Sequence, residues 1–153
     1  MSKITTFLAY NKEAEEAVRH YVAIFPGSEI KHISYYNEEG HLPKGTVMSV
    51  VFTLHGQTYY ALNTGSTFGF SEGISLLVTC ETQAEIDSYW EKLTEGGQPG
   101  PCGWLKDKFG VSWQVVPERL DQLLLDKDPE KAKRVMAAMM KMSKLDVAAL
   151  EAA

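Results

Sequence analysis

The sequence predicts an α+β protein made of two βαβββ modules followed by a helical extension. Two observations carry this prediction. First, a pattern of strand, amphipathic helix and further strands occupies residues 3–63 and recurs, imperfectly, in residues 74–117. Second, residues 119–153 follow a helical pattern that matches neither repeat. Two modules of this kind usually face each other around a shared cleft.

The first repeat opens with a β-branched and aromatic run at residues 4–10, which suits a half-buried strand. Over residues 12–25 the apolar side chains recur three and four positions apart, a spacing that predicts one buried helix stripe. Pro26 and Gly27 end this helix, because proline cannot continue the hydrogen-bond ladder and glycine accepts a left-handed cap. Three strands are expected next, at residues 29–36, 46–54 and 58–63, with a hairpin turn at residues 55–57.

The second repeat begins with an expected strand at residues 74–80. Thr82 and Glu85 then form a capping-box pattern, in which two side chains satisfy free backbone amides, so a helix starts there. The glycine pair at residues 96–97 ends that helix. Strands are expected again at residues 103–107 and 111–116, around a turn at residues 108–110. The order of elements therefore matches that of the first repeat.

Residues 119–153 are expected to form a helical extension of a single domain in residues 1–118. Asp128 precedes Pro129, which places a capping carboxylate before a proline at the first helical position. Ser143 or Asp146 can cap a last short helix over residues 147–152. Because helices this short need tertiary packing, we expect the extension to close over one end of the sheet or to pack on a partner chain.

Composition limits the classes of protein to consider. With 153 residues and 44% apolar content, the chain can bury one compact core. Its net charge of -5 offers no basic stripe for phosphates, so nucleic acid is not an expected partner. No basic and apolar leader precedes Ile4 and no apolar run matches a bilayer, so we expect a cytoplasmic protein with no membrane partner. In that reducing compartment Cys80 and Cys102 are expected to be thiols.

Several motifs are similar to those of one known family. They are Thr6-Phe7-Leu8, Ala14-Glu15-Glu16-Ala17, Ile24-Phe25-Pro26-Gly27-Ser28-Glu29-Ile30, the run from Cys102 to Gln114, and Asp128-Pro129-Glu130-Lys131-Ala132. Together they resemble the PhnB-like family of the glyoxalase, bleomycin-resistance and dioxygenase (vicinal oxygen chelate) superfamily. The resemblance covers residues 4–153. It implies paired modules that form a cupped, open sheet, a homodimer, and a small-molecule cavity inside the cup.

Enzymes of this superfamily hold one divalent metal with four side chains, taken from the first and last strand of each module. The resemblance places the corresponding positions of this chain at Thr5, Ala61, Ile74 or Ser75, and Gln114. Methyl and neutral hydroxyl groups cannot replace the carboxylates and imidazoles that nickel, zinc or iron prefer. We therefore expect no metal and no other cofactor, and the glyoxalase and dioxygenase mechanisms lose their Lewis acid.

A ligand pocket is nevertheless expected inside the cup. On the last strand Gln114 and Trp113 point to opposite faces, so Gln114 lines the cup if Trp113 lies under the helices. Its predicted members are Thr5, Phe7, Tyr59, Ala61, Asn63, Cys102, Trp104 and Gln114. This set is mostly apolar with a few polar groups, as small-molecule sites usually are. The alternative is that these residues form core. For the rings of Phe7 and Trp104 the two interpretations have equal weight. Gln114 and Asn63 favour the pocket, because a buried amide without a partner costs about 1 to 3 kcal/mol.

Cys102 is the one plausible nucleophile, because the neighbouring Gly100, Pro101 and Gly103 can expose its sulfur. A reactive thiol needs a nearby cation or base, and no histidine is close in sequence, although Lys106 can approach in space. An inert thiol is the favoured interpretation.

The remaining polar candidates are interpreted as structural. The histidines, at positions 20, 32, 41 and 55, lack the spacing of a chelating pair and are expected to be surface or hydrogen-bonded side chains. Asp107 precedes a tight turn, where carboxylates commonly accept backbone amides.

Three functions remain open. The favoured one is a metal-independent small-molecule-binding protein, similar to the resistance members of the superfamily. The second is an enzyme, either of lyase or dioxygenase type or one that uses Cys102. The third is a methyltransferase, because PhnB-like domains often carry the label demethylubiquinone methyltransferase. Methyl donors usually bind near a glycine-rich turn between a strand and a helix, however, and the turns at residues 10–12 and 80–82 contain no glycine.

Overall fold

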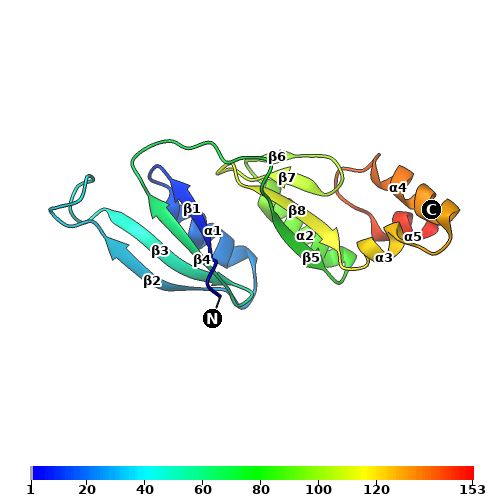
Figure 1. The fold of residues 1–153 in the computed structure, drawn as a ribbon, viewed down its shortest axis with the longest axis horizontal. Coiled ribbons are helices and arrows are strands. Elements are labelled where there is room, and N and C mark those ends of the chain that lie inside the picture. Colours follow the sequence, from blue (N-terminus) through cyan, green and yellow to red (C-terminus); the bar gives the residue numbers. More distant parts are fainter. Residues whose placement is uncertain (1) are drawn as a thin grey trace. The chain divides into compact units, whose positions relative to one another are not determined.

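The computed structural model describes residues 2–153 and has the α+β architecture that the sequence predicts (Figure 1). The chain forms two compact units, residues 1–69 and residues 70–153. The boundary between them falls between the two predicted repeats. Each unit contains one four-stranded mixed sheet, and none of the helices in residues 2–153 is long and apolar enough to cross a membrane.

The sheet of the first unit has the strand order β1-β4-β3-β2, with β1 parallel to β4 and the other pairs antiparallel. Its elements are β1 (Thr6–Tyr10), α1 (Ala14–Ile24), β2 (Glu29–Tyr35), β3 (Val47–Leu54) and β4 (Gln57–Asn63). Helix α1 packs against this sheet through a buried stripe that includes Ala17, Val18 and Tyr21. The apolar residues whose three-and-four spacing predicted this helix therefore form its buried stripe.

The hairpin between β3 and β4 turns at two residues with positive φ, His55 at 46° and Gly56 at 79°. A tight hairpin of this kind needs positive φ at both central positions, and glycine adopts it without steric cost. The turn predicted for residues 55–57 is therefore confirmed.

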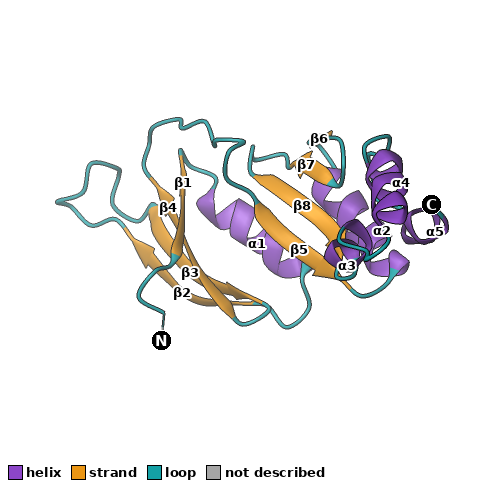
Figure 2. Ribbon diagram, turned by 45° about the vertical axis from the view of Figure 1, so that its right-hand side comes forward, coloured by secondary structure: helices purple, strands orange, loops and turns teal. Residues whose placement is uncertain are grey.

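The second unit repeats the same topology, with the strand order β5-β8-β7-β6. Its elements are β5 (Leu76–Cys80), α2 (Gln83–Thr94), β6 (Gln98–Pro99), β7 (Trp104–Lys106) and β8 (Ser112–Pro117), and α2 lies along one face of the strands (Figure 2). The Thr82 half of the predicted capping box is present, whereas Glu85 reaches the amide one residue before Thr82. Thr82 Oγ1 accepts a hydrogen bond from the Glu85 amide at 3.2 Å, and Glu85 Oε2 accepts one from the Glu81 amide at 2.9 Å.

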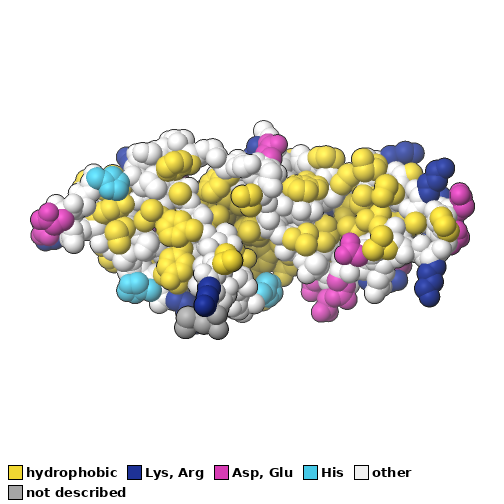
Figure 3. Space-filling view, viewed as in Figure 1, with side chains coloured by type: hydrophobic (Ala, Val, Ile, Leu, Met, Phe, Trp, Pro, Cys, Tyr) yellow, Lys and Arg dark blue, Asp and Glu magenta, His cyan; other side chains and the backbone are white. Residues whose placement is uncertain are grey.

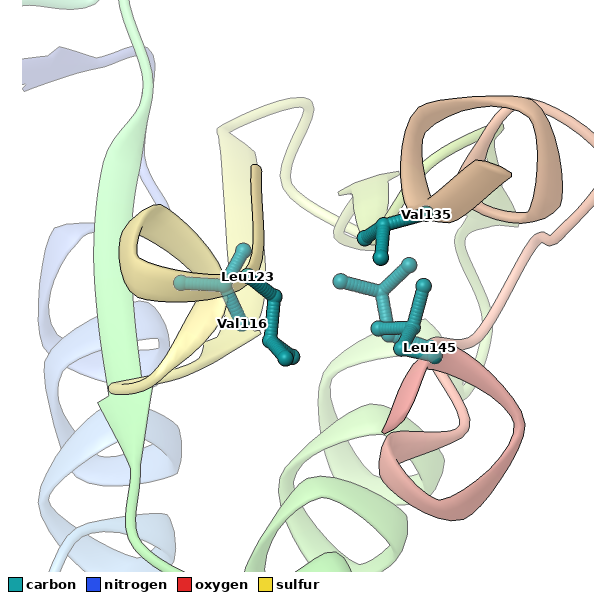
Figure 4. Close-up of a cluster of buried hydrophobic side chains, with 5 residues drawn as sticks. Val116, Leu123, Val135 and Leu145 are labelled. Atoms are coloured by element: carbon teal, nitrogen blue, oxygen red, sulfur yellow. The ribbon is translucent and has the colours of Figure 1, made fainter. Parts of the chain in front are cut away.

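The extension folds onto the second unit as α3 (Leu120–Leu124), α4 (Pro129–Met139) and α5 (Val147–Ala152). The last two helices start at caps that the sequence predicted, Asp128 and Asp146. Figure 4 shows side chains from β8, α3, α4 and the segment before α5 meeting in one cluster. Its buried members are Val116, Leu123, Val135, Leu145 and Leu150. The extension therefore closes over one end of the second sheet, as one of the two predicted alternatives stated.

Candidate functional site

In each unit the helix covers one face of the sheet, and the opposite face carries exposed apolar side chains. We call this second face the open face. In the first unit β1 and β4 place Phe7 beside Tyr60 there, with ring centroids 6.0 Å apart and exposed fractions of 56% and 38%. Leu8 and Ala61 form the next pair and are buried on the other face. Figure 3 shows hydrophobic side chains gathered over the strands of each unit.

The predicted facing of β4 is wrong by one residue. The sequence placed Tyr59, Ala61 and Asn63 on the same face as Phe7, but the parallel register pairs Phe7 with Tyr60. Tyr59 instead stacks on the fully buried Phe52, with ring centroids 5.4 Å apart. The reason is that β1 and β4 both tolerate apolar residues on either face, so alternation alone did not fix which face the helix covers.

Asn63 is buried because it holds the start of α1. Its Oδ1 accepts a hydrogen bond from the Ala14 amide at 2.8 Å, and its Nδ2 donates to the Val47 carbonyl at 3.1 Å. Glu13, the residue before the helix, makes no side-chain cap of its own. A distant amide thus satisfies a free helix N–H, which explains this buried polar residue without a ligand. Thr5 lies just before β1 and is exposed.

The predicted facing of β8 is confirmed. Trp113 is 2% exposed, whereas Gln114 is half-buried and pairs with Trp104 on one side and Leu77 on the other. Paired residues project from the same face of a sheet, so these three side chains share the open face of the second unit. Gln114 Nε2 donates a hydrogen bond to Ser75 Oγ at 3.0 Å.

A pocket of about 410 Å³ opens in the second unit beside β6 and β7. Its volume lies within the range of small-molecule sites. Of the predicted pocket residues, Trp104 is in its lining. The lining consists of Glu72, Gln98, Pro99, Gly100, Pro101, Trp104, Leu105, Lys106 and Ser112.

The extension supports one wall of this pocket. Between β6 and β7 the chain forms a loop at residues 100–103, and two of its amides donate to the extension at 2.8 Å, Cys102 to the Met142 carbonyl and Gly103 to the Ser143 carbonyl. Ser143 Oγ returns a hydrogen bond to the Gly100 carbonyl at 2.6 Å. Gly103 has φ of 84°, and a Cβ there would lie 2.8 Å from the Val115 carbonyl oxygen, so only glycine fits.

The polar groups of the pocket come from the sheet and from the segment before β5. Lys106 Nζ forms an ion pair with Glu72, at 2.5 Å from its Oε1. This hydrogen bond and the charge of Lys106 lower the pKa of the Glu72 carboxyl below its usual range. Ser112 is 4% exposed and lies in the same lining.

Cys102 lies outside this lining. Its Sγ is 3.6 Å from the Met139 carbonyl and 3.8 Å from Met140 Sδ, and neither group is a base that could activate a thiol. Cys80 is fully buried, and desolvation raises the pKa of its thiol to about 12. The surroundings of both sulfurs agree with the interpretation of inert thiols.

Asp107 is structural, as predicted. Its Oδ1 accepts hydrogen bonds from the Phe109 and Val111 amides at 2.8 and 3.0 Å, and its Oδ2 accepts one from Trp113 Nε1 at 2.8 Å. The carboxylate is 3% exposed and fixes the turn between β7 and β8. Among the histidines, His41 Nε2 contacts the Thr64 carbonyl at 2.7 Å.

The positions that correspond to metal ligands do not fit a metal. Ala61 offers a methyl group with no exposed surface, and the Gln114 amide bonds to Ser75. Within residues 2–153, no three His, Cys, Asp or Glu side chains lie close enough to one another to hold an ion. A hard or borderline cation prefers charged oxygen, imidazole or thiolate ligands, which this set lacks.

Paired βαβββ units with helices on one face define the glyoxalase and bleomycin-resistance fold. Two solved structures of low identity share it. Protein PA1353 from Pseudomonas aeruginosa is 19% identical with a TM-score of 0.65, and the match covers 77% of this chain and 98% of that one. The fosfomycin resistance protein FosX from Listeria monocytogenes is 13% identical with a TM-score of 0.53, over 80% and 97% of the two chains.

The chain belongs to the family described as 3-demethylubiquinone-9 3-methyltransferase, whose model matches residues 2–116. A putative member of that description, the PhnB protein from Bacillus cereus, is 41% identical with a TM-score of 0.69. That match covers 76% of this chain and 99% of the Bacillus chain. No curated protein matches the sequence. Because the matched family segment ends at residue 116, helices α3 to α5 lie outside it.

Proposed function

We propose that this protein is a metal-independent small-molecule-binding protein of the PhnB-like family, and that its ligand occupies the pocket beside β6 and β7. The pocket itself carries the proposal. An aromatic wall at Trp104 stands beside three polar side chains, Gln98, Lys106 and Ser112, in about 410 Å³. Apolar walls with a few convergent polar groups are typical of small-molecule sites.

Metal independence is proposed from the chemistry of the residues at the ligand positions. Thr5, Ala61, Ser75 and Gln114 provide no carboxylate, imidazole or thiolate. Recognition in the pocket therefore depends on hydrogen bonds, charge and apolar contact.

The proposal includes a homodimer. Phe7, Tyr60 and Leu77 leave 56%, 38% and 58% of their surfaces exposed on the open faces of their sheets. Exposed apolar side chains on the open face of a sheet often belong to a protein interface. We expect a dimer in light scattering of the purified chain, and a shift towards monomer in Phe7→Asp.

The family description names a methyltransferase, and this activity is the second candidate. The turns between β1 and α1 and between β5 and α2 contain no glycine, whereas methyl donors usually bind at a glycine-rich turn. Calorimetry with S-adenosylmethionine separates the two functions: no binding supports the binding protein, and tight binding supports the methyltransferase.

A thermal-shift screen of small aromatic and amphipathic compounds tests the proposal on protein that has been incubated with nickel, zinc, manganese or ferrous iron and then desalted. We expect at least one compound to raise Tm without being transformed, and Trp104→Ala to remove that shift. Tyr35→Ala is the matched control, because Tyr35 is an exposed aromatic of the first unit. Retention of about one metal ion per chain, or turnover of the bound compound, would contradict the proposal.

A further inference from the structure

The polar side chains of the pocket form one row across three strands. The register pairs Gln98 with Lys106 and Lys106 with Ser112, so the three positions lie side by side on β6, β7 and β8. Directly paired residues project from the same face of a sheet, with their Cβ atoms close together. The row combines an amide, an ammonium and a hydroxyl, and each of these groups can donate a hydrogen bond.

The groups of this row differ in burial. The Lys106 side chain is 36% exposed and Ser112 is 4% exposed. Polar groups in the wall of a pocket fix the orientation of a ligand, so this row offers hydrogen bonds to a molecule that enters there.

Glu72 is the one acidic residue in the lining of the pocket. It lies before β5, and its side chain is 75% exposed although it pairs with Lys106. An ion pair this exposed contributes little to stability, because water and salt screen it. Exchange of the Glu72 carboxylate for another anion on Lys106 therefore disturbs little else in the fold.

We propose that the pocket selects a small organic anion with an aromatic or apolar body, and that Glu72 is an internal counter-ion which such a ligand displaces from Lys106. This inference rests on the proposed binding function and names its ligand class. The anionic group lies on the row of Gln98, Lys106 and Ser112, while the apolar body lies against Trp104, which is two positions along β7 from Lys106. Lys106 is the one charged group of this row, and it would repel a cationic ligand.

Matched probes test the inference. Benzoate, benzenesulfonate and phenylphosphonate carry an anion on a phenyl ring, and benzamide and benzyl alcohol are their neutral counterparts. Calorimetry on the full-length protein at neutral pH is expected to show the anions binding about tenfold or more tightly than the neutral compounds. Added salt is expected to weaken the anions and to leave the neutral compounds nearly unchanged.

Variants of the ion pair sharpen the test. Lys106→Gln is expected to remove the preference for anions, and Glu72→Gln is expected to tighten anion binding by about threefold or more because the competing carboxylate is gone. Lys108→Gln and Glu95→Gln are the controls. Both residues lie outside the pocket lining, and neither change is expected to alter binding. Circular dichroism checks that each variant is folded.

Two results would overturn the inference. One is equal affinity for benzoate and benzamide in the unaltered protein, which refutes the anion preference while the binding function stands. The other is an anion preference that survives Lys106→Gln, which moves the anion site elsewhere. The failure of the binding function itself is seen separately, as a compound screen in which no Tm shift depends on Trp104.

Discussion

The two sheets have the same strand order and differ in the length of their second and third strands. In the first unit β2 and β3 have 7 and 8 residues, whereas the corresponding β6 and β7 have 2 and 3. The long strands β2 and β3 pair along most of their length. The short pair leaves the loop at residues 100–103 outside the sheet, where the extension binds it, and the pocket lies beside this loop. The pocket thus lies in the unit whose second and third strands are short.

The turns that close the two last hairpins differ in a related way. The β3 to β4 turn depends on backbone conformation, with positive φ at His55 and Gly56. The β7 to β8 turn depends on a side chain, because the buried Asp107 carboxylate accepts hydrogen bonds from Phe109, Val111 and Trp113. The short β7 contributes few ladder bonds of its own, so we infer that the second unit relies more heavily on single side chains.

Asp107→Ala is expected to have the largest effect on stability. The substitution removes the acceptor to which the buried Trp113 Nε1–H and the Val111 amide donate. The free energy of unfolding should therefore fall by about 4 kcal/mol. Gly56→Ala in the other turn should cost about 1 kcal/mol, the penalty for a side chain at positive φ. Urea unfolding of both variants measures the difference. Similar losses in the two turns would contradict the contrast between them.

Leu145→Ala tests whether the extension supports the pocket wall. Leu145 is fully buried in the cluster shown in Figure 4, and its truncation should cost about 3 kcal/mol. The Cys102 and Gly103 amides should then exchange faster with deuterium, because their acceptors lie on the segment just before Leu145. Leu125→Ala, at a residue that is 80% exposed, is the control and should change neither quantity. Unchanged deuterium exchange of these amides in Leu145→Ala would mean that the loop at residues 100–103 keeps its conformation without support from the extension.

Asn63→Ala separates structural from ligand-binding polar groups. Loss of its two hydrogen bonds leaves the Ala14 amide and the Val47 carbonyl without their partner and should lower the free energy of unfolding by about 2 kcal/mol. Binding of benzoate should not change. If Asn63→Ala had normal stability but no longer bound benzoate, Asn63 would be a ligand-binding residue, as the sequence predicted.

The smallest expected effect on stability comes from the thiol of Cys80. The native Cys80 thiol, with its pKa raised from 9.0 to about 12, stays protonated at a pH where the unfolded thiol ionises. The contribution of the protonated Cys80 thiol to the free energy of unfolding is therefore fully present below pH 9.0 and is lost as the pH rises towards 12. The difference in stability between the unaltered protein and Cys80→Ala should shrink over that range. In the native state a thiol reagent should modify Cys102 first, and rapid modification of both cysteines would show that Cys80 is accessible.

Local signals predicted most of the fold. Caps at Thr82, Asp128 and Asp146 placed three helices, and the Gly-containing turn at residues 55–57 placed a hairpin. Strand β6 was not predicted, because two residues that end in proline show no alternation. Helix α3 lies in the predicted helical extension, but its bounds were not predicted, since five residues are too few for a periodic pattern.

The site was harder to predict than the fold because it depends on register and on distant pairs. Trp104 was predicted to line a pocket and is in the lining observed, but Lys106 and Ser112 become neighbours only through the β7 to β8 register. Glu72 lies 34 residues from Lys106 in the chain, and no local pattern links the two. Asn63 was assigned to the pocket because a buried amide signals a partner, and its partner proved to be a helix amide.

The central claim is that the second unit, and not the open aromatic face of the first, holds the ligand. Amide and indole NMR spectra of the ¹⁵N-labelled protein, recorded during a titration with benzoate, test this most directly. We expect the signals of the Trp104 indole and of the Gln98, Lys106 and Ser112 amides to shift together in a saturable way. The amide signals of Phe7 and Tyr60 should not change. Saturable shifts centred on Phe7 and Tyr60, with the Trp104 indole unmoved, would contradict the claim.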